Sequence, residues 1–137
     1  MPVQVIERDG VRYAEILRAS EHVEHSTFFS PASSSLQFGL LAHGAGFVEA
    51  PHTHKTTSRT IDDLQQMFVV QRGAVAVEFY TDEGTKFAEV QLGVGDAILL
   101  VHGAHGLRVL EDMQCVSVKQ GPFLGAAHDK IWLEVGK

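Results

Sequence analysis

Side chains alternate in character along one central stretch of the chain. The alternation runs between two sets, Val75, Val77, Phe79 and Ala76, Glu78, Tyr80. Successive side chains of a β-strand point to opposite faces, so this period of two predicts a strand with one apolar face. Asp82-Glu83-Gly84 follows as a hairpin turn, and residues 86–92 form the expected return strand.

Further strands are expected at short, even intervals. They cover residues 3–6, 11–17, 36–42, 66–73, 97–101, 107–110 and 113–120. Turns are expected at Asp9-Gly10, after Gly73, at 93–96 and at Glu111-Asp112. Residues 20–35 predict a loop with room for an edge strand, and residues 55–64 predict a loop or a short helical turn. No helical period of useful length appears before residue 124. About ten short strands at this spacing predict an all-β sandwich or barrel.

Length and composition narrow the class of protein. A chain of 137 residues suits one domain, and 45% hydrophobic with 20% charged residues is typical of a globular protein. The net charge of −6 and the lack of a basic stripe argue against nucleic-acid binding. No run of 18 apolar residues predicts a membrane span, and the first residues do not resemble a secretory signal. Cys115 is the single cysteine and cannot form an internal disulfide, so we expect a reducing, cytoplasmic setting. It lies in an apolar strand pattern and is interpreted as core.

Two histidines one residue apart mark the candidate site. His52 and His54 follow Gly46-Phe-Val-Glu-Ala-Pro. Residues i and i+2 of a strand share a face, so two imidazoles can converge on one metal ion. The alternative to metal binding is that the two histidines are a solvated loop pair beside Pro51. A third histidine, His105, returns several strands later.

These residues resemble the two sequence motifs of the cupin family. The first motif is matched by Gly46, His52, His54 and Gly73, and the second by Gly95, Gly103 and His105. The chain departs from the family pattern in four ways: Gln66 stands where the family usually has Glu, the gap before it (55–65) is longer than usual, Val101 replaces a Pro, and His105 comes one residue early. The match covers roughly residues 40–120, so residues 1–35 would add N-terminal edge strands to a single cupin domain over 1–137.

The resemblance implies a fold, a metal and a set of ligands. The fold would be a single cupin barrel, that is, a double-stranded β-helix or jelly-roll. One divalent transition metal ion (Zn, Fe, Ni or Mn) would bind inside it to His52, His54, Gln66 and His105. The loop 103–106 and the segment 118–123 also look like a subgroup of small bacterial cupins without a settled activity, in which the long loop tends to carry an Arg, here Arg59.

Strand parity supports an inward site. Gln66 shares a face with Phe68 and Val70, and His105 shares one with Leu107 and Val109. These faces are apolar and should point into the barrel. Polar groups buried there need partners or a ligand.

Several other residues are candidates for the same site. His102 has the opposite parity to His105, and Asp62 or Asp63 would supply a carboxylate from the loop. Gln66 is a weaker ligand than a carboxylate and can instead hydrogen-bond a metal-bound water or a substrate. The other histidines, which lack partners at ligand spacing, are interpreted as structural or exposed: His22, His25, His43 and His128.

The expected site leaves two main classes of function open. A cationic metal can polarise a carbonyl or lower the pKa of bound water, which favours an isomerase- or epimerase-like enzyme or another metal-assisted proton transfer. Arg59 and Tyr80 would orient a small polar, sugar-derived or anionic ligand, since arginine binds carboxylate or phosphate in a bidentate way. The alternative is a non-catalytic binding or sensing module, and an iron-dependent dioxygenase is a further one. The catalytic residues stay open, and a homodimer is expected because exposed sheet edges are often paired by oligomerisation.

Overall fold

The computed structural model describes residues 3–135 and shows an all-β protein. Its strands are β1 (Val3–Arg8), β2 (Val11–Leu17), β3 (Thr27–Phe28), β4 (Gly39–Leu40), β5 (Gln66–Tyr80), β6 (Lys86–Leu92), β7 (Ala97–Leu100) and β8 (Ala104–Lys119). The only helix in this described part is a single turn, α1 (Ala126–Asp129). Within residues 3–135, no helix has the length and apolar character to cross a membrane.

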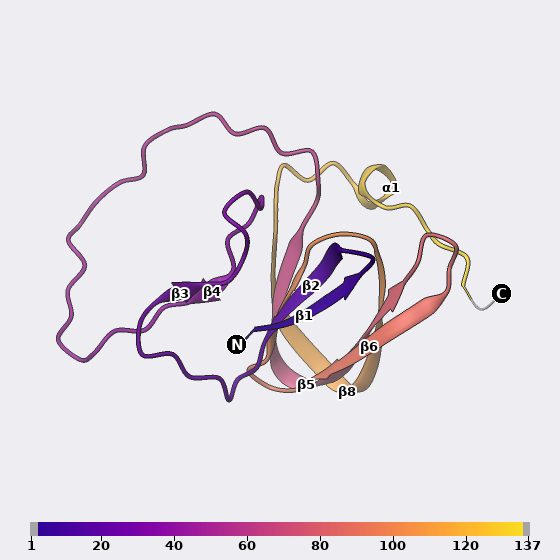
Figure 1. Ribbon diagram of the computed structural model, residues 1–137, viewed down its shortest axis with the longest axis horizontal. Helices are drawn as coiled ribbons and strands as arrows, with labels where there is room; N and C mark the ends of the chain where they lie inside the picture. The colour runs from indigo at the N-terminus through magenta and orange to yellow at the C-terminus, as the bar shows by residue number, and fades with distance from the viewer. Residues whose placement is uncertain (1–2, 136–137) are drawn as a thin grey trace.

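The main sheet is antiparallel, has six strands and is built around β5. The order is β1-β2-β7-β5-β6, and β8 also pairs with β5. The first part of β5 pairs with β7 and with the end of β8, and its second part pairs with β6 and with the start of β8. Figure 1 shows the sheet curling on itself into a half-barrel, while β3 and β4 form a separate pair beside it.

Strands β5 and β8 bend together halfway along their length. The register between them shifts three times between Val70 and Val75. Gly73 lies here at φ 80°, in a region that favours glycine, and a Cβ atom on it would overlap the backbone of Asp112 and Glu111. Turns were predicted after Gly73 and at Glu111-Asp112, and this was wrong. β5 and β8 each continue through these points, because the two irregular points lie opposite one another and bend the ladder without ending it.

The inner face of the curl carries the larger hydrophobic core. Its buried residues come from β2, β5, β6 and β7, and include Ile16, Phe68, Val77, Phe79 and Ile98. Gln66 has the parity of Phe68, and His105 lies opposite Phe79 in the register. The prediction that Gln66 and His105 belong to the inward faces of their strands is therefore confirmed.

The outer face of β2 and β7 is covered by residues 29–38. Leu17, Leu99 and Phe38 form a second core there. The buried carboxylate of Glu15 lies on the same face and accepts hydrogen bonds from Arg12 (2.9 Å) and from the Ser30 hydroxyl (2.8 Å). Because a buried charge needs such partners, these bonds fix the covering segment to β2.

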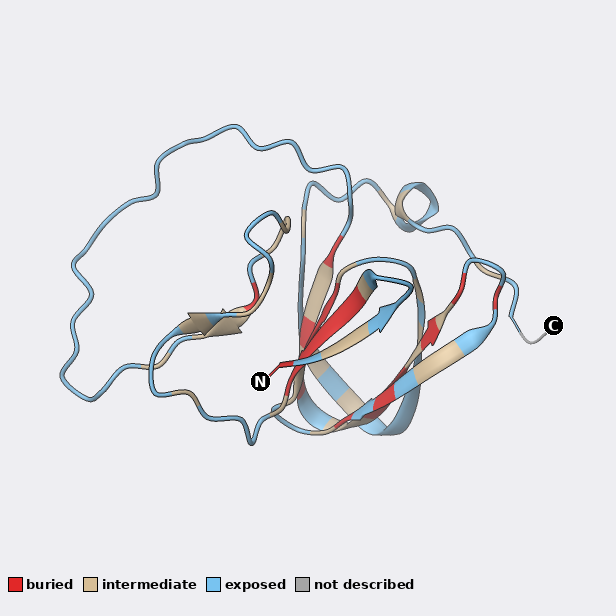
Figure 2. Ribbon diagram, in the orientation of Figure 1, coloured by how far each residue is buried: buried red, intermediate tan, exposed pale blue. Residues whose placement is uncertain are grey.

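Residues 43–64, which we call the arm, leave the half-barrel altogether. Figure 1 shows the arm as a wide arch around β3 and β4, and Figure 2 shows it exposed throughout. No strand is assigned to it. The predicted strand at 36–42 is reduced to β4, which pairs only with β3.

Other expectations from the sequence have clear outcomes. The hairpins β1–β2 and β5–β6 and the strand β7 lie where they were predicted. The single continuous strand β8 replaces the expected final hairpin. Cys115 is partly buried and packs against the inner core, as its apolar setting indicated.

The bend gives a test of the fold. We expect Gly73→Ala to lower the free energy of unfolding by about 2–4 kcal/mol, because the new Cβ combines an unfavourable φ with overlap on the facing backbone. Gly44→Ala is the matched control, since a Cβ atom there meets no neighbour and its φ is ordinary. Urea unfolding of the three proteins measures the difference. Equal stability of the two variants would show that the bend is not closely packed.

Candidate metal centre

A cleft of about 780 Å³ opens on the inner face of the half-barrel. The ends of β5 and β7, the start of β8 and the C-terminal segment 123–135 line it. Gln66, Tyr80 and His105, three of the predicted site residues, belong to this lining. Much of the remaining lining is apolar and includes Leu100, Leu107 and Ile131. A concave site with a few polar groups on apolar walls is typical of small-molecule binding.

Gln66 starts β5 and is held by its neighbour across the strands. It pairs with Lys119 in the register, and its side-chain amide donates a hydrogen bond of 2.8 Å to the Ser117 hydroxyl. This bond uses the amide nitrogen, so the side-chain carbonyl oxygen, which is the atom that can ligate a cation, stays available to another partner. Ser117 therefore orients the amide.

His105 lies one residue into β8, directly after the turn at Gly103. His105 lines the cleft, and much of its surface is exposed. Desolvation by the neighbouring protein lowers the pKa of His105, the backbone of Gly103 opposes the shift, and Lys130 adds to it. The imidazole is therefore neutral near pH 7, which is the form that binds metals.

The Gly103 turn has a clear physical basis. Gly103 has φ 79°, and a Cβ atom on it would overlap the ring of Tyr13. The chain can pass this close to the ring only with glycine. The turn thus sets where His105 begins its strand.

Tyr80 lies at the edge of the cleft, and its hydroxyl already has a partner. It donates a hydrogen bond of 2.6 Å to Glu78, which raises the pKa of Tyr80 and lowers that of Glu78. Glu78 also pairs with Arg108 (3.1 Å) and with Lys86 (3.5 Å). These groups satisfy one another, so Tyr80 is held beside an ion cluster.

The histidine pair lies on the arm. The ring centroids of His52 and His54 are 5.3 Å apart and tilted by 56°. Two imidazoles that each bind one tetrahedral ion through a single nitrogen have centroids roughly 5 Å apart, so this spacing fits a shared metal. The Nδ1 atom of His52 donates to the carbonyl of Ala50 at 2.8 Å, which leaves Nε2 as the nitrogen available to a metal. The Glu49 carboxylate is 3.4 Å from that Nε2.

The structure does not bring the histidine pair to His105. His52, His54 and Arg59 are exposed on the arm, whereas Gln66 and His105 line the cleft. Among residues 3–135, no three His, Cys, Asp or Glu side chains lie close enough to hold a metal. One chain in this conformation therefore carries the expected ligands in two separate halves.

The rival residues divide between the cleft and the arm. His102 lines the cleft and meets the ring of Tyr13 edge-on at 6.1 Å. Asp63 also lines it, but its oxygens accept hydrogen bonds from Ser35 (2.5 Å) and Gln65 (2.9 Å). The Ser35 bond is the largest cause that lowers the pKa of Asp63. Asp62 is exposed.

Some residues of this region could not be found from the sequence. Ser117 orients Gln66 from 51 positions away, and Lys119 and Lys130 line the cleft from the end of β8 and the C-terminal segment. Gln65 is buried, and its Oε1 has no hydrogen-bond partner within the described chain. No local pattern marks these positions, because strand pairing alone brings them together.

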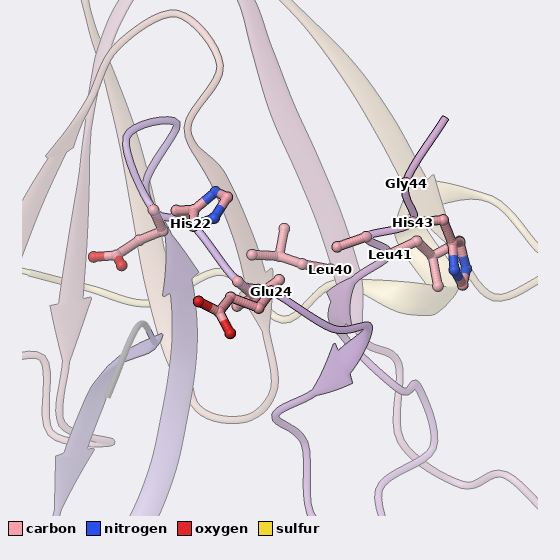
Figure 3. A pocket seen from close by; sticks show the side chains of 9 residues that line it. His22, Glu24, Leu40, Leu41, His43 and Gly44 are labelled. Atoms are coloured by element: carbon pink, nitrogen blue, oxygen red, sulfur yellow. The ribbon is translucent and has the colours of Figure 1, made fainter. Parts of the chain in front are cut away.

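A second hollow, of about 550 Å³, lies beside β4 and is more open. Figure 3 shows His22 and Glu24 on one side of it and His43 on the other, with Leu40 and Leu41 between them. These polar side chains do not converge, which agrees with the interpretation of His22 and His43 as structural or exposed.

Comparisons with known proteins add nothing to this geometry. No family model matches the chain, and neither a curated protein nor a solved structure matches it. The residues themselves carry the functional argument.

The environment of His105 predicts its titration. Its NMR titration midpoint should fall below the usual value of about 6.5, because the surrounding protein disfavours the imidazolium. Below pH 6.5 the unfolded chain takes up this proton before the folded chain does, so stability should fall as the pH drops through this window. His105→Gln should remove that part of the pH dependence and identifies the resonance. A midpoint at or above 6.5 would contradict the desolvated setting.

Proposed function

We propose that this protein is a cupin that binds one first-row divalent ion per chain through His52, His54 and His105, with Gln66 or water completing the shell. The observation that carries the proposal is the presence of two half-sites in different parts of the chain. The arm holds two imidazoles at the spacing for one ion, and the lining of the cleft includes the His105 imidazole and the Gln66 amide. Imidazole ligands suit zinc, iron and nickel.

The same cleft would hold the ligand, which we propose to be a small polar or anionic molecule. Lys119 and Lys130 lie in its lining and favour a negative group, and the apolar walls exclude water from around it. The ammonium groups are placed by aromatic rings: Lys119 lies over Phe123 at 5.6 Å, and Lys130 over Trp132 at 5.4 Å. The cleft would therefore orient a ligand by charge at its rim and by shape within.

An enzyme of this kind would transfer a proton on its substrate. The ion, when bound, supplies a Lewis acid for a carbonyl or hydroxyl. Gln66 and Ser117 would hold a polar group of the substrate or a water beside it, and Tyr80 would border the substrate from the opposite end of β5. Isomerisation or epimerisation of a sugar-like molecule fits these parts.

A binding or sensing module without turnover is the second candidate, and one observation favours it. Two carboxylates near the cleft are already engaged: Glu78 with Tyr80 and Arg108, and Asp63 with Ser35 and Gln65. His102 and Asp129 also line the cleft. The engaged carboxylates suit recognition more than proton abstraction.

Removing the arm histidines tests the metal site. The His52→Ala, His54→Ala double variant should lose the zinc that the wild type retains after desalting, because one imidazole and an amide bind too weakly. His22→Ala with His25→Ala is the matched control, as a second exposed pair outside the proposed site. Elemental analysis gives zinc per chain, and circular dichroism checks that the strands persist. Full zinc in the arm variant would refute the assignment.

Restoring the carboxylate tests Gln66. Gln66→Glu should tighten zinc binding about tenfold or more, because it places a negative charge next to a dication with little change of shape. The new carboxylate can accept a hydrogen bond from Ser117, so the present contact is kept with its roles reversed. Gln71→Glu, the same change at an exposed position on β5, is the control and should leave affinity unchanged. Chelator competition measures all three, and equal affinities would mean that Gln66 does not face the metal.

A further inference from the structure

The two halves of the proposed site are held apart by contacts at both ends of the arm. At its start, Ser26 bonds to the amide and the carbonyl of Ala42 at 2.9 and 3.4 Å. At its end, Asp63 is bonded to Ser35, and the amide of Gln65 donates to Gln120 at 2.7 Å. These contacts send the arm outward, around β3 and β4 (Figure 1). A return of the arm into its own cleft would have to break some of them.

The arm carries apolar side chains that are largely exposed. Phe47 and Val48 are 55% and 81% exposed, and Ile61 is also exposed. The interactions recorded for residues 44–61 are local, such as His43 stacked on Phe47 at 3.9 Å and the contacts of His52 with Ala50 and Glu49. Exposed apolar side chains on an extended segment are typical of a surface that binds a partner.

The half-barrel presents a matching apolar surface near His105. Leu107 and Val109 lie opposite Val77 and Val75 on the inner face of the sheet, yet they are 48% and 52% exposed. β8 pairs only with β5, so its other edge is unpaired in the described chain. A free edge beside an apolar face accepts an added segment of extended chain.

The arm is long enough to reach this surface on another molecule. An extended chain advances about 3.3 Å per residue, so the middle of the arm can lie roughly 30 Å from its two ends. A compact domain of 137 residues has a radius of gyration of about 14 Å. The arm can therefore reach well into a neighbouring subunit while both of its ends stay anchored.

We propose that two copies of the chain exchange arms, so that His52 and His54 of one copy meet His105 and Gln66 of the other. A two-fold arrangement makes both exchanges equivalent and gives two metal sites per dimer. Phe47 and Val48 would cover Leu107 and Val109. The inference rests on the proposed metal site, and it assigns that site to the junction of two subunits.

Mixed dimers test the sharing directly. Chains carrying His52→Ala with His54→Ala are co-expressed with chains carrying His105→Ala under a different tag, and the doubly tagged dimer is isolated. With exchanged arms, one site of this dimer keeps every histidine and the other keeps none, so it should hold half the zinc of the wild-type dimer. Arms that close on their own chain leave both sites damaged, and the mixed dimer would hold no zinc. That result overturns the proposal.

A second measurement does not depend on metal. Phe47→Ser with Val48→Ser should raise the dimer dissociation constant about tenfold or more in sedimentation, since it removes two apolar side chains from the contact. Val94→Ser is the control, because Val94 is exposed on a turn outside the arm and cleft. Both changes are at exposed positions, so the fold should be kept.

The outcomes separate the two proposals. A wild type that is monomeric at micromolar concentration overturns the exchange, whatever its metal content. An unchanged dissociation constant in the Phe47, Val48 variant does the same. A dimer weakened by that variant but free of zinc would support the arm contact and refute both the proposed function and the shared metal site.

Discussion

The pairing of β5 on both of its edges is the constraint on which the rest of the molecule depends. β5 hydrogen-bonds to β7, β6 and β8, so every other strand of the main sheet is attached to it directly or through β7. Because β5 and β8 bend together at Gly73, the sheet curls, and its inner face becomes concave. The cleft exists because of that bend, and its polar residues lie at the two ends of the same strand or across from them.

Few polar side chains of the strands face the inside of the curl. Four charged side chains of β5, β6 and β8 pair with one another in the cluster of Glu78, Lys86, Glu89 and Arg108. Hydrogen bonds from Lys86 and Arg108 lower the pKa of Glu89, so this cluster stays ionised over a wide pH range. His105 and Gln66 are left as the polar groups of the strands that face the cleft interior, beside the lysines at its rim. Such a surface can bind a charged ligand or ion from outside the chain.

Local patterns predicted the parts of the fold that depend on neighbours in sequence. The hairpins formed where turn residues separate alternating strands, and parity placed Gln66 and His105 on the inward faces. The patterns failed at Gly73 and at Glu111-Asp112, because a turn signal in one strand can be accommodated by a bulge in its partner. The location of His52 and His54 could not be predicted either. Their spacing fixes their relation to each other, but only the contacts of Ser26 and Asp63 decide where the arm goes.

The exposed arm has a consequence for how long the protein survives in a cell. Proteases cut extended, solvent-exposed segments far faster than paired strands, and the arm is such a segment along its whole length. An arm that lies against a second molecule is shielded from them. If arms are exchanged, the rate of degradation depends on chain concentration: newly made chains at low abundance would be nicked and cleared, while the same chains at higher abundance would protect one another. Half-life would then report assembly, without any dedicated degradation signal.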